Sequence, residues 1–123
     1  MKAMFALLAL ALAACASVPP AAAGPTAGLG QYAEVDGLRI RPVRVIEDSR
    51  CPLDVQCVWA GRLVVETEVS GSAPYQLHQL DLGKPRAIAG AGGTVTLVAT
   101  EPGKTAGAAI PPGAYRFTFK RGP

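Results

Sequence analysis

Cysteines are the residues of this 123-residue chain whose types and spacing point most directly to chemistry. There are three of them, Cys15, Cys51 and Cys57. A thiol can accept a lipid, pair with a second thiol or bind a metal ion. Cys15 directly follows an apolar stretch near the N-terminus, whereas Cys51 and Cys57 lie six positions apart in the middle of the chain. These two settings predict different chemistry.

The surroundings of Cys15 predict lipidation. Lys2 gives a positively charged start, residues 4–14 form an uninterrupted apolar run, and Leu12-Ala13-Ala14-Cys15 resembles a bacterial lipobox. The run is shorter than the ~20 residues that a helix needs to cross a bilayer. We therefore expect residues 1–14 to be a cleaved signal peptide and Cys15 to carry a diacylglyceryl group. Two or more acyl chains anchor a protein stably, where one chain is marginal.

The next residues set the expected location and the domain boundaries. Ala16, rather than Asp, follows the cysteine, which by resemblance to Gram-negative lipoproteins implies the outer membrane, facing the periplasm. Residues 15–30 are rich in Ala, Pro and Gly and carry no charge, which predicts a lipidated flexible tether. Residues 31–123 are expected to form a single β-rich domain.

Short alternating segments after residue 30 predict an all-β fold. In the clearest segment Tyr115, Phe117 and Phe119 alternate with polar residues. The Asp36-Gly37 pair between two strand-like runs predicts a hairpin, and Pro42 within a strand-like run predicts an edge strand or a bulge. Further strands are expected at 63–69, 75–82 and 94–99. No stretch keeps helical spacing over three turns, so we expect a small antiparallel β-sandwich or barrel of about seven short strands.

Once Cys15 is acylated, Cys51 and Cys57 are left as an even pair in an exported protein, which predicts a disulfide bond. Closing such a short loop contributes about 2.4 kcal/mol on the chain-entropy model. Trp59 follows closely, and its indole is expected to cover the bridge or a sheet face. A thiol-redox role stays open, but the spacing is not the Cys-x-x-Cys of thioredoxin-like proteins and favours a structural bridge.

The segment around this pair resembles a known motif. Residues 48–52 and 55–61 match D-S-R-C-P-x-x-V-x-C-[VI]-W-A-G, which is found in a family of small exported bacterial proteins and lipoproteins. The ending 110–117, Ile-Pro-Pro-Gly-Ala-Tyr-Arg-Phe, is similar to theirs as well. The resemblance implies an exported β-domain with a local disulfide and no assigned substrate.

The candidate binding surface is the loop from Asp48 to Arg62. Within it Arg50, Trp59 and Arg62 combine charge with a large aromatic ring, and these residue types are enriched at binding hot spots. The alternative is that Trp59 belongs to the core and the arginines only pair with neighbouring carboxylates. The partners expected for such a surface are an envelope protein or a glycan, in addition to membrane lipid through acylated Cys15.

Other classes of function find little support. The formal net charge is only +3 and the basic residues are scattered singly, so no nucleic-acid partner is expected. One histidine, His78, and two leader methionines give no ligand set, so we expect no metal and no cofactor. A G-x-S-x-G elbow is absent from the sequence, which argues against nucleophilic hydrolysis.

The sequence therefore favours a non-enzymatic envelope lipoprotein that acts as a binding or structural β-domain. Two alternatives stay open. One is an envelope inhibitor of a lysozyme or protease, which rests on fold-level analogy. The other is a minor thiol-redox factor, which would need an accessible and reducible bridge between Cys51 and Cys57.

Overall fold

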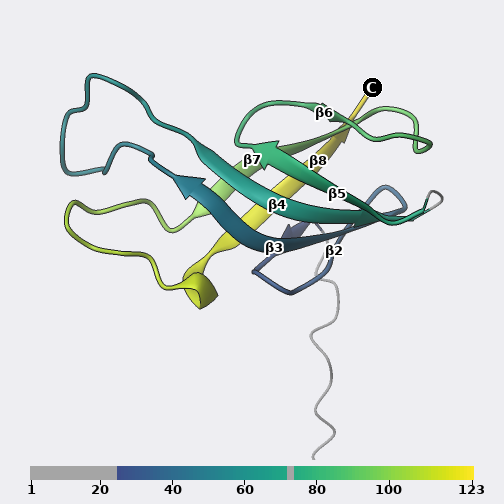
Figure 1. Cartoon of the computed structure of the whole chain (residues 1–123), viewed down its shortest axis with the longest axis horizontal. Helices are drawn as coiled ribbons and strands as arrows, with labels where there is room; N and C mark the ends of the chain where they lie inside the picture. The colour runs from purple at the N-terminus through teal and green to yellow at the C-terminus, as the bar shows by residue number, and fades with distance from the viewer. Residues whose placement is uncertain (1–24, 72–73) are drawn as a thin grey trace, which may run out of the picture.

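Eight β-strands form two four-stranded antiparallel sheets in the computed structural model, which describes residues 25–71 and 74–123. The all-β prediction is confirmed; of the two expected architectures the structure has the sandwich, with eight strands instead of about seven (Figure 1). Cys15 and the expected signal peptide lie outside the described residues. One sheet has the order β1 (Thr26–Ala27), β8 (Arg116–Gly122), β7 (Thr94–Glu101) and β6 (Arg86–Ala87). The other has the order β2 (Ala33–Val35), β3 (Leu38–Asp48), β4 (Leu63–Ser70) and β5 (Gln76–Asp81).

The core lies between the inner faces of the two sheets. Phe117 and Phe119 of β8, with Leu97 of β7, pack against Ile40 of β3 and Val65 of β4, and all five side chains are buried. Successive strand residues point to opposite faces, so the period of two read in the sequence matches the observed burial. The predicted alternation around Phe117 and Phe119 is therefore confirmed.

The predicted hairpin is present between β2 and β3. Val35 pairs with Leu38, and the two residues between them, Asp36 and Gly37, have φ of 45° and 83°. Positive φ at both central positions is typical of a type I′ turn, whose twist suits the two flanking strands. This hairpin starts β3, the longest strand in the described part of the chain, which leads to the candidate loop.

Pro42 lies at a bulge in β3. Of the two alternatives predicted for it, an edge strand or a bulge, the bulge is confirmed. The pairing of β3 with β4 shifts register between Pro42 and Arg44, and again between Val45 and Glu47. β2 pairs only with the first residues of β3, and beyond it the Pro42 carbonyl accepts a hydrogen bond from the Gly30 N–H at 2.8 Å. Proline has no N–H for a ladder, so it fits at this open side of the strand.

The folded domain begins earlier than the composition predicts. Thr26 and Ala27, assigned to the tether by sequence patterning, form β1 and pair with Thr118 and Phe117 of β8. Ala27 is buried in the core. A strand of two residues is too short to show an alternating pattern, which is why the boundary at residue 30 is wrong. The domain starts by residue 26.

Two long loops extend from the same end of the sandwich (Figure 1). One joins β3 to β4 and contains both cysteines, and the other joins β7 to β8 and contains η1 (Pro112–Ala114), a single 3-10 turn. The strand pairs Asp48–Leu63 and Glu101–Arg116 mark where the two loops leave the sheets. Among the residues that the structure describes, no helix has the length and apolar character needed to cross a bilayer.

Candidate functional site

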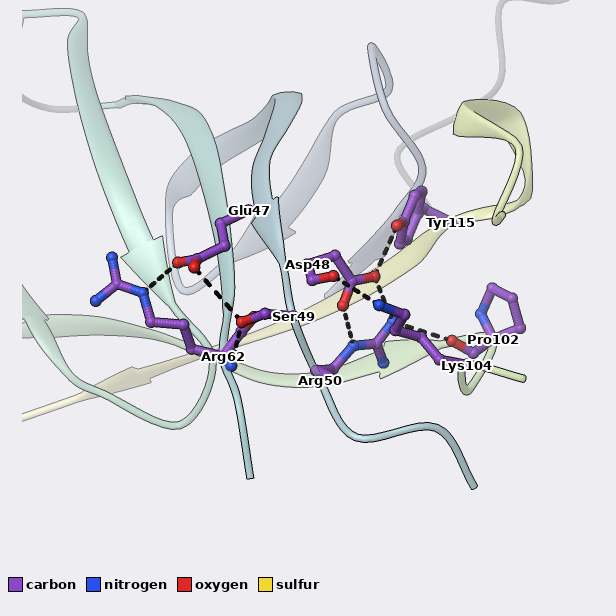
Figure 2. A network of polar contacts seen from close by, with 8 residues as sticks. All are labelled: Glu47, Asp48, Ser49, Arg50, Arg62, Pro102, Lys104 and Tyr115. Carbon is purple, nitrogen blue, oxygen red and sulfur yellow. Dashed lines mark hydrogen bonds and ion pairs between the residues drawn. The ribbon is translucent and has the colours of Figure 1, made fainter. Parts of the chain in front are cut away.

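The Asp48 carboxylate joins the two loops at their base (Figure 2). Arg50 donates from Nε to Oδ1 at 2.8 Å and from Nη2 to Oδ2 at 2.9 Å. Tyr115, at the end of the β7–β8 loop, donates its hydroxyl hydrogen to Oδ2 at 2.7 Å. Lys104 of the same loop donates from Nζ to the Asp48 carbonyl oxygen at 2.7 Å. Because Arg50 and Asp48 are largely buried, this two-pronged ion pair is better protected from water than a surface pair.

The contacts around Asp48 lower its own pKa and raise the pKa of Tyr115. Burial alone would raise the pKa of Asp48, but hydrogen bonds from Arg50 and Tyr115, with the positive charges of Arg50 and Lys104, outweigh it and hold the pKa below its usual value. Burial, followed by the hydrogen bond to the Asp48 carboxylate, raises the pKa of Tyr115 to about 12. At neutral pH the network therefore joins a charged carboxylate to a neutral phenol.

The two arms of the cysteine loop are held together above this base. The Ser49 N–H donates to the Arg62 carbonyl at 2.9 Å, and the Cys51 N–H donates to the Ala60 carbonyl at 3.1 Å. Gly61 has φ of 67°, and a Cβ there would lie 1.7 Å from the Ser49 carbonyl oxygen, so only glycine fits. These contacts hold the two arms together in addition to the covalent closure of the loop.

A disulfide bond between Cys51 and Cys57 closes the loop, with a Cα–Cα distance of 5.8 Å. The predicted pairing is confirmed. The β7–β8 loop braces the closed loop from one side: the Leu53 N–H donates to the Lys104 carbonyl at 2.8 Å, and Asp54 Oδ1 accepts from the Ala106 N–H at 2.8 Å. The loop is thus fixed by a covalent bond and by a neighbouring segment of the fold.

The loop exposes four apolar side chains within seven residues. Leu53 is 83% exposed, Val58 is 92% exposed and Trp59 is 83% exposed, and Val55 beside them is also exposed. We call these four residues the loop tip. Isolated exposed apolar residues are ordinary, but four within seven residues of one loop are the kind of concentration that marks interaction sites.

The core interpretation of Trp59 is wrong. Its indole lies off the core, which is filled by aromatic side chains of the C-terminal strand and by Tyr115. Cys57 is itself exposed, so the indole does not shield the bridge either. The short disulfide loop carries Trp59 past the end of the sheets, where no inner face is left to receive it.

The two arginines of the predicted surface have different positions. Arg50 is largely buried at the base, where Nη2 also donates a hydrogen bond to the Pro102 carbonyl at 3.3 Å. Arg62 is exposed at the edge of the loop and pairs with Glu47 at 2.5 Å. Both arginines thus pair with carboxylates, and the largely buried Arg50 offers little surface to a partner.

Sequence reasoning missed Leu53, Val55 and Val58 as surface residues. The available signal was that apolar residues lie within and just after a disulfide loop too short to form strands of its own. The described residues hold no group of three His, Cys, Asp or Glu side chains suited to a metal ion. Comparison with protein-family models, curated proteins and solved structures found no match to this chain. The motif resemblance of residues 48–61 stays a prediction.

Proposed function

We propose that this protein is a non-enzymatic binding module on a lipid-anchored envelope lipoprotein, and that the loop tip is its contact surface. The observation that carries the proposal is the exposure of Leu53, Val58 and Trp59 on a loop with a fixed base. Exposed apolar surface costs free energy in water, so its burial against a partner is favourable. A loop that is already ordered loses little conformational entropy on binding, which increases the net affinity.

The anchor is supported by the N-terminal pattern. The apolar run before Cys15 and the lipobox-like residues 12–15 both favour export with acylation. The disulfide between Cys51 and Cys57 is in keeping with this, since such bonds persist in oxidising compartments outside the cytoplasm. Intact-mass measurement of the membrane-extracted chain tests the anchor. We expect a species that begins at Cys15 and carries acyl chains; an unmodified chain beginning at Met1 would contradict it.

Site-specific photo-crosslinking in intact cells tests the contact surface. A photoreactive amino acid that inserts into C–H bonds is placed at Val58 and, as a matched control, at Val98 on the outer face of β7, which is 44% exposed. We expect adducts from position 58 in clear excess over position 98, whatever the chemical class of the partner. Equal adduct yields at the two positions would exclude the loop tip as the contact surface.

A further inference from the structure

We infer that the partner of the loop tip is the lipid–water interface of the bilayer that carries the chain. In this arrangement Leu53, Val58 and Trp59 enter the boundary between headgroups and acyl chains. The inference rests on the proposed function, including the lipid on Cys15, and it names the surface to which the tip binds.

The tip has the side-chain chemistry of an interfacial contact. Tryptophan is enriched where an apolar body meets water, because its ring prefers the apolar side and its N–H still finds a polar partner. Leu53 and Val58 add apolar surface that is almost fully exposed. Residues 51–61 contain one charged side chain, Asp54, whose Oδ1 accepts the Ala106 N–H from the neighbouring loop. The Asp54 carboxylate is therefore bound to the neighbouring loop, and residues 51–61 carry no cation.

The charges around the tip are satisfied within the domain, which favours lipid over a protein partner. Arg50 pairs with Asp48 at the buried base, and Arg62 pairs with Glu47 at the loop edge. Protein interfaces surround an apolar centre with a polar rim that binds the partner and sets the register. Here both flanking arginines are already paired, and the one charge within the segment, Asp54, is held by the neighbouring loop. The other exposed side chains of residues 51–61 are neutral. A fluid lipid interface needs no polar contacts to align it with the domain, so it suits a surface of this kind.

The length of the tether between Cys15 and the domain permits this contact. Nine residues separate Cys15 from Pro25, a segment that spans at most about 35 Å when fully extended. The Pro25 carbonyl accepts from the Phe119 N–H, and Tyr115, four residues earlier along the chain, bonds to Asp48 at the base of the loop. Four extended residues cover about 13 Å. The root of the tether thus lies near the base of the loop, and the reach of about 35 Å allows an anchored domain to turn this end toward the same bilayer.

Trp59 is the only tryptophan, so its fluorescence reports on the tip without labelling. The acylated full-length mature chain is reconstituted into phosphatidylcholine vesicles, and its emission is quenched either by lipids brominated along the acyl chains or by aqueous iodide. We expect a blue-shifted emission that brominated lipid quenches several-fold more than iodide does. Because no free cation takes part, we expect the same result at low and high salt and without anionic lipid.

Charged substitutions distinguish membrane contact by the loop tip from membrane attachment by the acyl anchor. Leu53→Asp combined with Val58→Asp should move Trp59 into water. Iodide should then quench its emission more than brominated lipid does, while the acyl anchor keeps the chain on the vesicle. Val98→Asp, on the outer face of β7, should leave the wild-type ratio unchanged. Far-ultraviolet circular dichroism confirms that each variant is folded. An indole that iodide reaches freely in the wild-type anchored chain would overturn the inference.

The failure of this inference is distinguishable from the failure of the proposed function. If the photoreactive group at position 58 captures lipid, both stand. If it captures a protein, a glycan or a second copy of this chain, the lipid inference is overturned and the binding function of the tip is retained. If it captures nothing above the position-98 control, both fall.

Discussion

Tyr115 donates its hydroxyl hydrogen to Asp48 at 2.7 Å across 67 positions of sequence. Asp48 ends β3 in one sheet, and Tyr115 immediately precedes β8 in the other. The contact therefore joins the two sheets at the end where the cysteine loop leaves them. It also explains how an exposed apolar loop is held in one place, because the same Asp48 carboxylate accepts both hydrogen bonds from Arg50.

We expect stability to fall between pH 10 and pH 12. The pKa of Tyr115 is raised from its ordinary value of 10.0 to about 12 by burial and by its bond to Asp48. In that window the folded protein holds a proton that the unfolded chain has released, so the free energy of unfolding decreases as the pH rises, by up to about 2 kcal/mol. Urea unfolding at a series of pH values measures it. Tyr115→Phe should flatten the profile, and an equal slope in this variant would contradict the assignment.

Arg50 should matter for stability and Arg62 should not. Arg50→Ala leaves the Asp48 carboxylate largely buried with two of its three hydrogen bonds removed, which we expect to lower the free energy of unfolding by about 2 kcal/mol. Arg62 forms an exposed ion pair, and such pairs contribute little, so Arg62→Ala serves as the matched control. Chemical denaturation of both variants makes the comparison. Equal losses would show that the buried position of Arg50 has no energetic weight.

Gly61 is expected to tolerate no side chain. Gly61→Ala places a Cβ 1.7 Å from the Ser49 carbonyl oxygen, at φ of 67°. Gly107 in the other loop has a similar φ of 73° and no atom within 4 Å of the same position, so Gly107→Ala reports the backbone strain alone. We expect about 1 kcal/mol for Gly107→Ala and at least about twice that for Gly61→Ala in thermal unfolding. If the two variants melt together, the close approach at Ser49 is wrong.

The disulfide should be structural and resistant to mild reduction. Replacing Cys51 and Cys57 together by Ser should lower stability by about 2 kcal/mol, because the open loop gains conformational entropy in the unfolded chain. The sheets should persist, since neither cysteine contributes to the core. Titration with a glutathione redox buffer separates this from the redox alternative: a bridge that equilibrates at the potential of thiol oxidoreductases would favour a redox role instead.

Local sequence patterns predicted the parts of the fold that depend on local physics. The alternation of Tyr115, Phe117 and Phe119 gave the buried face of β8, and Asp36-Gly37 gave the turn, because side-chain direction and positive φ are set within a few residues. The disulfide was predicted from the even pair of thiols that remains when Cys15 is assigned to the expected lipid anchor.

Long-range arrangement was not predictable in the same way. No local pattern says that the loop after β7 lies against the loop after β3, so the contacts of Asp48 with Tyr115 and Lys104 were missed. Trp59 was assigned to the core by one interpretation because large aromatic residues usually are buried. The disulfide loop overrides that tendency by holding Trp59 beyond the ends of the strands.

Oxidative footprinting of Trp59 in intact cell envelopes tests the central claim most directly. Hydroxyl radicals modify exposed aromatic rings, and Tyr75, which is exposed just before β5, serves as an internal reference within the same chain. The wild type is compared with the Leu53→Asp, Val58→Asp variant in the same membranes. We expect Trp59 to oxidise several-fold more slowly, relative to Tyr75, in the wild type than in the variant. Equal rates in the two proteins would mean that nothing covers the loop tip in the cell and would contradict its assignment as a binding surface.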